Sequence, residues 1–209
     1  AMAQAFAIDP TVEECRGELE RLAGVLESWR RLVGVYENVL ESEEGESDAT
    51  LSLLLRTASL YEAELEDSSG AILAYQRVVE LDDTNEAALS ALERLLEGSG
   101  DMTALVEVLE REAELADDPQ RREELLWRIA RLWEGELNRP DRAVAAYQRV
   151  YEENPESLPV LDALAGLYRS AENWPSLTDV LRAKLEVVND EGLARSLRLE
   201  LAEIYDELL

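Results

Sequence analysis

The sequence ASLYEAEL at residues 58–65 returns as ARLWEGEL at residues 130–137 and as AEIYDELL at residues 202–209, each copy 72 residues after the last. A second motif keeps this interval, since residues 71–78 read AILAYQRV and residues 143–150 read AVAAYQRV. A third begins at Trp29, Met102 and Trp174, at intervals of 73 and 72 residues. Self-similarity at one period indicates a repeat architecture.

Apolar residues in these motifs recur at spacings of three and four, which is typical of amphipathic helices. One such face consists of Leu51, Leu54, Leu55, Ala58, Tyr61 and Leu65, and that of the next helix of Ile72, Tyr75, Val78 and Val79. Turn-forming residues separate the segments at 68–70, 98–101, 138–140 and 172–173. No segment alternates with period two, so the pattern predicts no strand.

The spacing predicts about eleven helices, at residues 11–26, 29–41, 49–66, 69–82, 85–97, 101–116, 119–137, 140–153, 156–170, 174–188 and 191–208. Helices joined by such short turns lie antiparallel, as hairpins. Each 72-residue unit then contains two hairpins of about 36 residues. A lone hairpin cannot bury both of its faces, so we expect the hairpins to stack in one direction.

The hairpin that begins near Leu51 resembles the tetratricopeptide repeat family, and so does the one that begins near Glu123. The family's sequence of large, small and aromatic residues is matched by Leu54, Ala58, Tyr61, Ala71, Tyr75 and Val78, and again by Leu126, Ile129, Ala130, Trp133, Ala143, Tyr147 and Val150. The position where the family usually has its closing proline is occupied here by Pro10, Asp83 and Pro155. The resemblance implies an all-α fold, a right-handed α-α superhelix of antiparallel helix hairpins in a tetratricopeptide-like solenoid. Small residues would let paired helices approach closely, with aromatic rings filling the space between hairpins.

The resemblance is uneven along the chain. The intervening hairpins have Leu32, Leu105 and Leu177 where the family prefers alanine, and Thr57 stands where a large apolar residue is usual. We therefore expect a degenerate array in which two types of hairpin alternate.

The ends of the sequence fall inside the repeat pattern. Residues 1–10 align with the tail of a preceding repeat, or are residues added for expression, and residues 191–209 form a first helix without its partner. We expect residues 11–209 to form a single array of about five hairpins plus an unpaired last helix, cut from a longer protein. Open ends expose apolar faces, so we expect a monomer or weak self-association through them.

Composition excludes several classes of function. The chain has 47 acidic and 20 basic residues and a net charge of −27, with no cluster of Lys and Arg, which disfavours nucleic acids and anionic membrane surfaces. No window reaches about 18 apolar residues, so no membrane insertion is expected. No signal peptide is visible, which favours the cytoplasm without fixing the compartment. The acidity favours a basic partner or serves solubility alone.

The residue types for catalysis are also missing. The chain has no His and one Cys, Cys15, which we interpret as a buried structural thiol. We expect no enzyme activity, no cofactor and no metal site. The acidic run from Glu41 to Asp48 lacks the spacing of a calcium loop and is interpreted as solvated. Asp117-Asp118-Pro119 and the run from Asp82 to Asn85 are interpreted as helix starts.

The four tryptophans have apolar counterparts in the other copies, which predicts packing rather than a ligand cage. They are Trp29, Trp127, Trp133 and Trp174.

A stacked array has a concave groove, lined by the first helix of each pair. The outward polar positions of those helices are the candidate groove contacts, and they are Ser59, Glu62, Arg94, Arg131, Glu134, Glu203 and Asp206. The leading hypothesis is a protein–protein interaction scaffold that binds a peptide or protein in this groove, and the acidity of the chain would suit a basic partner. The alternative is a structural or regulatory spacer or sensor region of a larger bacterial signalling or envelope protein. The bacterial source is inferred from the strong preference for Arg, since Lys184 is the one lysine.

Overall fold

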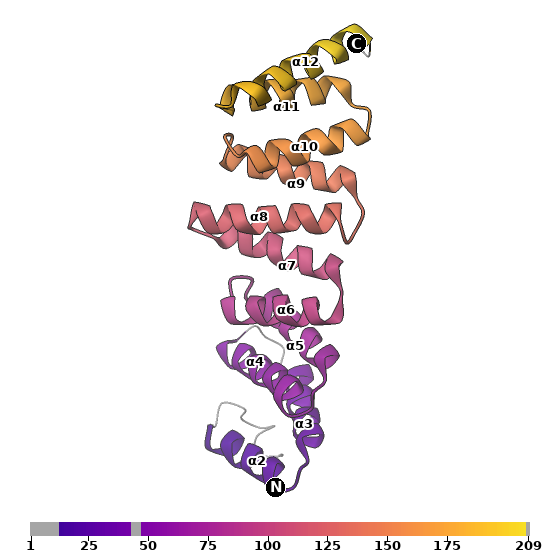
Figure 1. Ribbon diagram of the computed structural model, residues 1–209. Coiled ribbons are helices and arrows are strands. Elements are labelled where there is room, and N and C mark those ends of the chain that lie inside the picture. Colours follow the sequence, from indigo (N-terminus) through magenta and orange to yellow (C-terminus); the bar gives the residue numbers. More distant parts are fainter. Residues whose placement is uncertain (1–12, 43–46, 208–209) are drawn as a thin grey trace. The chain divides into compact units, whose positions relative to one another are not determined.

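The computed structural model describes residues 13–42 and 47–207, which form eleven helices and no strand (Figure 1). The chain divides into two compact units, Ala1–Val108 and Leu109–Leu209, here called the N-terminal and the C-terminal unit. The all-α prediction is therefore confirmed. The predictions for residues 1–10 and for positions 43–46 of the acidic run concern residues outside the described ranges. The expected single array stays a prediction.

The N-terminal unit consists of helices joined by short turns. They are α2 (Glu13–Val25), α3 (Trp29–Ser42), α4 (Asp48–Ala63), α5 (Ser68–Leu81) and α6 (Glu86–Ser99), and the boundary between the units falls within α7 (Met102–Leu115). Consecutive helices from α2 to α6 pack against each other.

The C-terminal unit repeats this pattern of hairpins. Its complete helices are α8 (Pro119–Glu134), α9 (Pro140–Glu153), α10 (Leu158–Ser170), α11 (Trp174–Val187) and α12 (Glu191–Glu207). Each packs against the next, and α8 and α9 lie side by side in Figure 1. The helix bounds agree with the prediction to within a few residues.

Short polar residues fix where the helices begin. Asn85, Asp118 and Asn173 accept backbone N–H bonds at the starts of α6, α8 and α11, and Pro119 and Pro140 occupy first turns. The predicted starts at 82–85 and 117–119 are therefore confirmed. The predicted break at 68–70 is wrong, because Asp67 caps α5 and these residues form its first turn.

The predicted alternation of hairpins follows the small residues. Ala58 and Ala71 are fully buried where α4 meets α5, as are Ala130 and Ala143 where α8 meets α9. These two hairpins pack more extensively than α2 with α3 or α10 with α11. In the latter pairs, the bulkier side chains of Leu32 and Leu177 are buried instead. Two leucines keep helix axes further apart than two alanines do.

Two predictions of burial were too strong. The four tryptophans are only half-buried, and so is Cys15. Trp127 packs edge-on against Tyr147, with ring centroids 5.1 Å apart, so its role is packing at the rim of the α8–α9 hairpin rather than at its centre.

Candidate protein-interaction surface

The candidate contacts of the N-terminal unit lie on α4 and α6. Ser59 and Glu62 are half-buried on α4, and Arg94 is exposed on α6. The Arg94 guanidinium donates to Glu62, with Nη2 2.6 Å from Oε1. The structure therefore brings Glu62 and Arg94 together across two hairpins. Burial raises the pKa of Tyr75 on α5, and the nearby Glu62 carboxylate raises it further.

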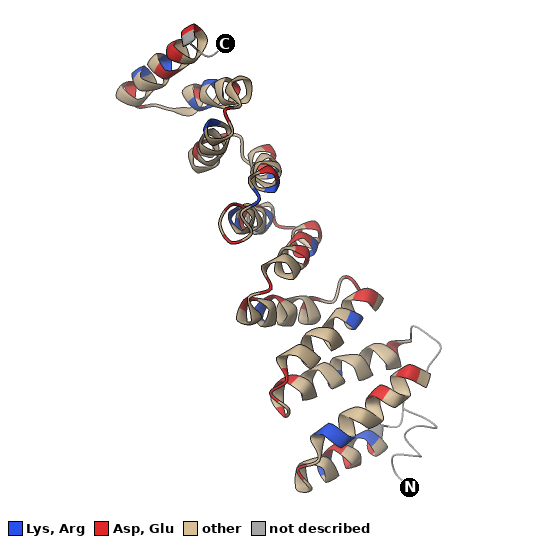
Figure 2. Ribbon diagram, turned by 90° about the vertical axis from the view of Figure 1, so that its right-hand side faces the viewer, with Lys and Arg blue, Asp and Glu red and all other residues tan. Residues whose placement is uncertain are grey.

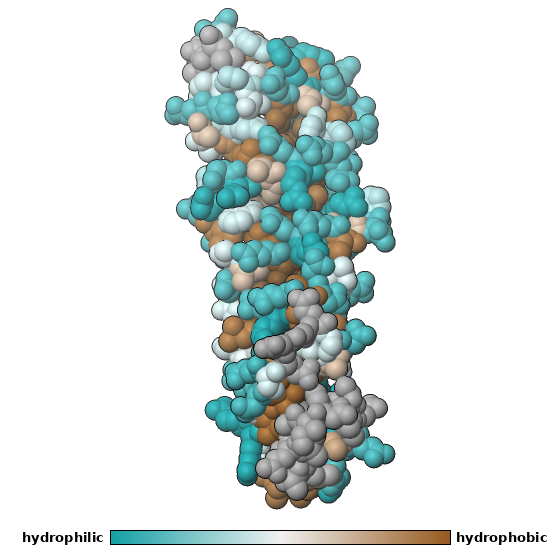
Figure 3. Space-filling view, turned by 180° about the vertical axis from the view of Figure 1, so that it is seen from behind, coloured by the Kyte–Doolittle hydropathy of each residue, from teal (hydrophilic) through white to brown (hydrophobic). Residues whose placement is uncertain are grey.

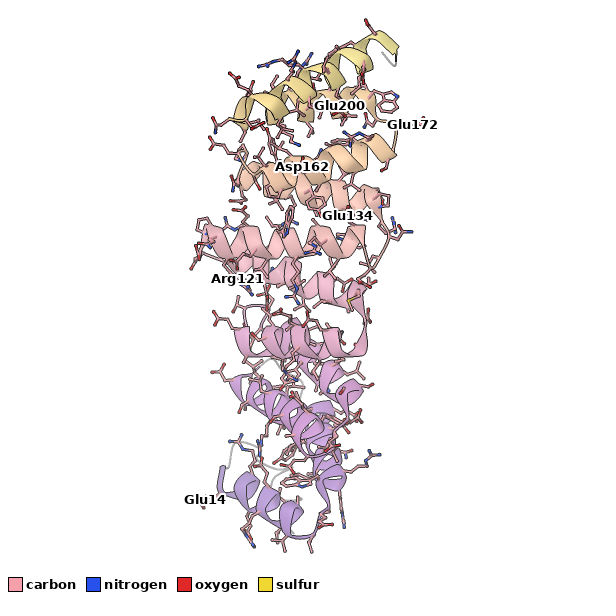
Figure 4. All side chains as sticks on the ribbon, viewed as in Figure 1. Glu14, Arg121, Glu134, Asp162, Glu172 and Glu200 are labelled. Carbon is pink, nitrogen blue, oxygen red and sulfur yellow. The ribbon has the colours of Figure 1, made fainter. Side chains whose placement is uncertain are left out.

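The candidate contacts of the C-terminal unit lie on α8 and α12. Arg131 and Glu134 are exposed on α8, and Glu203 and Asp206 are exposed on α12. Figure 4 labels Glu134 near the end of α8. The Tyr147 hydroxyl of α9 donates to Glu134 at 2.7 Å. Burial raises the pKa of Tyr147, and the hydrogen bond to Glu134 adds to this effect.

Other charged contacts between alternate helices were missed by the sequence reasoning. Arg56 on α4 donates to Glu20 on α2 through Nε at 2.8 Å and Nη2 at 2.7 Å, and the Tyr36 hydroxyl donates to Glu20 at 3.1 Å. In the C-terminal unit, Arg169 on α10 donates to Glu200 on α12. A search for opposite charges about one hairpin apart in the sequence would have found both pairs.

Each unit also has a hollow on the side of the second helices. In the N-terminal unit, about 350 Å³ is enclosed by residues of α3, α4 and α5, namely Glu37, Leu54, Thr57, Tyr61, Gly70, Leu73, Ala74, Gln76, Arg77 and Glu80. In the C-terminal unit, about 260 Å³ is lined by residues of α9, α10 and α11, namely Gln148, Tyr151, Leu161, Leu164, Tyr168, Ser176, Asp179, Val180 and Ala183. Both volumes lie near the lower limit of the range for ligand pockets.

The surface is acidic and mixed in polarity. Acidic residues are distributed over the helices of both units (Figure 2), and the face in Figure 3 shows hydrophilic residues around scattered apolar ones. Among the described residues, no group of three or more His, Cys, Asp and Glu is arranged to hold a metal ion. Within the same ranges, none of the helices has the length and apolar character needed to cross a bilayer.

Paired helices with buried alanines at their contact, and polar residues that vary on the outer face, define the class of helical-repeat proteins. Two tetratricopeptide repeat models match the chain directly, at residues 88–123 and 124–157. Residues 88–157 therefore belong to repeats of the tetratricopeptide family. Proteins of this family are scaffolds for protein–protein interaction, and neither matching model describes a catalytic domain.

Solved structures with similar folds are distant in sequence. A crystal structure of MamA is 14% identical, with a TM-score of 0.40, and the match covers 87% of this chain and 95% of that one. YrrB, described as a TPR protein with an unusual peptide-binding site, is 17% identical with a TM-score of 0.40 over 95% and 98% of the two chains. Pseudomonas aeruginosa pilF is 14% identical with a TM-score of 0.42 over 99% and 85%. No curated protein gives a significant match.

Proposed function

We propose that this chain is a scaffold that binds a protein or peptide along the polar faces of the first helices. These helices are α4 and α6 in the N-terminal unit and α8, α10 and α12 in the C-terminal unit. The observation that carries the proposal is the contrast between the two sides of these helices. Apolar positions repeat with the 72-residue period, while outward positions such as Ser59 and Arg94 change, to Arg131 and Gly166 in the next copy, although Glu62 is kept as Glu134. A surface that varies over a constant core is what partner-specific recognition needs.

The charge of the chain favours a basic partner. The five most exposed candidate contacts are Arg94, Arg131, Glu134, Glu203 and Asp206, and three of them are acidic. An acidic surface attracts basic segments and speeds their association at low salt.

The test is affinity capture from a lysate of the source organism, with quantitation by mass spectrometry. Wild-type chain is compared with a variant that reverses three charges on the first helices, Glu134→Arg, Glu203→Arg and Asp206→Arg. The matched control reverses three exposed acids on α9 and α11, by Glu152→Arg, Asp179→Arg and Glu186→Arg. We expect a reproducible partner that the first variant loses and the control keeps. No reproducible partner for the wild-type chain would overturn the scaffold proposal, and equal loss in both variants would overturn the assignment to the first helices.

A further inference from the structure

One carboxylate has a partner cation in the first copy of the repeat, and the position of that cation is a glycine in the second copy. Glu62 of the first copy corresponds to Glu134 of the second, and Tyr75 corresponds to Tyr147, each 72 residues later. The third member of the first copy, Arg94, corresponds to Gly166. The carboxylate and the tyrosine are therefore retained, and the cation is missing.

The first copy shows how the complete set is arranged. The Arg94 guanidinium comes from α6, one hairpin further along the chain, and lies 2.6 Å from Glu62. Both side chains are partly exposed, so the pair forms on the surface of the N-terminal unit rather than in its core. The helices that carry it, α4, α5 and α6, pack in the same order as α8, α9 and α10 of the second copy.

The second copy leaves room where the cation would stand. Glu134 still accepts the Tyr147 hydroxyl bond at 2.7 Å, which holds the carboxylate in place. A Cβ built on Gly166 meets no atom within 4 Å, so the position on α10 opens to free space. A glycine inside a helix costs stability compared with almost any other residue, and here no close approach of the backbone explains it.

Neighbouring cations of the C-terminal unit do not replace Arg94. Arg169 on α10 is bound to Glu200, and Lys184 on α11 is bound to Asp162. Arg131 is three residues before Glu134 on α8. Its charge lowers the pKa of Tyr147, whereas Glu134 raises it. Among the described residues, Glu134 has no ion-pair contact within 4 Å.

We propose that Glu134, Tyr147 and the open position above Gly166 form a seat for an arginine side chain of a partner protein. The arginine of the partner would occupy the place that Arg94 fills in the first copy. This proposal rests on the scaffold function and specifies the chemistry of its partner. Arginine fits better than lysine, since a planar guanidinium can bind a carboxylate through two parallel hydrogen bonds.

The experiment uses the full chain and a small probe, so that no partner sequence has to be assumed. N-acetyl-arginine methylamide is titrated into ¹⁵N-labelled protein, with the neutral citrulline analogue as the reference ligand, and amide shifts are recorded. We expect saturable shifts at Glu134 and Gly166 with the arginine probe, and shifts at least about fivefold smaller with citrulline. The equivalent amides of Glu62 and Arg94 should not respond, because their seat is filled.

Two variants and a matched control for each test the assignment. Gly166→Arg should restore the pair of the first copy and abolish the response, and it should fold, because the position is open and Arg is a good helix former. Gly166→Gln controls for bulk without charge and should keep at least half of the shift at Glu134. Glu134→Gln should abolish the response, while Glu152→Gln, which removes an equal charge from α9, should leave it unchanged.

The two proposals fail in different ways. No saturable shift at Glu134 and Gly166, or a shift that survives both Glu134→Gln and Gly166→Arg, would overturn the arginine seat. A partner captured equally by wild type and by Gly166→Arg would also overturn it, while leaving the scaffold function in place. Loss of that partner in Gly166→Arg alone would support it.

Discussion

Thr57 and Ile129 occupy the same position in successive copies of the repeat, and both side chains are buried. The Thr57 hydroxyl donates to the Leu53 carbonyl of its own helix at 2.8 Å, so it has a partner but fills less space than isoleucine. Thr57 lines the hollow of the N-terminal unit, whereas Ile129 is fully buried in the core of the C-terminal unit. The mismatch predicts that the first copy carries a correctable packing defect.

Thr57→Ile should stabilise the protein by about 1 kcal/mol, because it fills part of the hollow without leaving a polar group unpaired. The reverse change, Ile129→Thr, should destabilise it by about 2 kcal/mol. Urea denaturation followed by circular dichroism measures both. A Thr57→Ile variant that unfolds at lower urea than wild type would show that the hollow cannot accept the larger side chain.

Glu20 offers a prediction about pH. Burial alone would raise the pKa of its carboxyl group, but the hydrogen bonds and charge of Arg56, together with the Tyr36 hydrogen bond and the charge of Arg16, hold the pKa below the usual value. A carboxyl whose pKa is lowered by folding stabilises the protein above its unfolded pKa, and this contribution is lost as the pH falls through the folded value.

The unfolding midpoint of the wild type should therefore fall more steeply than that of Glu20→Gln as the pH is lowered from about 5 to about 3. At neutral pH, Glu20→Gln should be the less stable of the two. Thermal melts across this range measure the difference, with Glu152→Gln as the exposed control. Parallel profiles for wild type and Glu20→Gln would show that the contact with Arg56 contributes nothing to folding.

At the scale of the helix pair, the α8–α9 contact depends on small residues. Ala143 is fully buried against α8, whereas Ala145 on the same helix is exposed. The first copy has Leu73 at the position of Ala145, and 64% of that side chain is exposed. The α9 helix therefore contains one position that excludes a large side chain, Ala143, and another, Ala145, whose counterpart on α5 is a large and exposed side chain.

Ala143→Leu should destabilise the protein by about 2 kcal/mol, because a larger side chain forces the two helices apart. Ala145→Leu should change the stability by less than about 0.5 kcal/mol. Equilibrium unfolding of both variants provides the comparison. Equal effects at the two positions would contradict the close approach of α8 and α9.

The same helices show which features the sequence could predict. Their bounds follow from turn chemistry and apolar spacing, so residues such as Asn85 and Pro119 mark the ends within a few positions. The difference in packing between the two types of hairpin follows from the residue at the helix contact, which is alanine in one type and leucine in the other. The pairing of Glu62 with Arg94 could not be predicted, because surface contacts depend on the rotation between hairpins, which apolar periodicity does not specify. The half-burial of Trp127 has the same cause.

At the scale of the whole chain, the net charge of −27 predicts a dependence on salt. Excess charge of one sign destabilises a folded chain by self-repulsion, and salt screens it over about 10 Å at 0.1 M. The melting temperature should rise between 20 mM and 500 mM NaCl. A fall in melting temperature would mean that attractive pairs such as Glu20 with Arg56 outweigh the repulsion.

Exposed apolar side chains on α12 lead to the last prediction. Leu199 is 60% exposed and Tyr205 is 44% exposed, whereas their counterparts on α8, Trp127 and Trp133, are half-buried beside α9. Exposed apolar surface of this kind favours association with a second apolar face. We therefore expect weak, concentration-dependent self-association, opposed by the charge that every copy carries.

Sedimentation equilibrium at several concentrations in 150 mM NaCl would detect this association as a rise in average mass. Leu199→Glu should reduce the rise, because it adds a charge to the apolar face of α12. Leu73→Glu is the matched control, since it changes an equally exposed leucine on α5. A constant monomer mass for the wild type would contradict the association. If the two variants reduced the rise in mass equally, the added charge rather than the loss of the apolar face of α12 would explain the reduction.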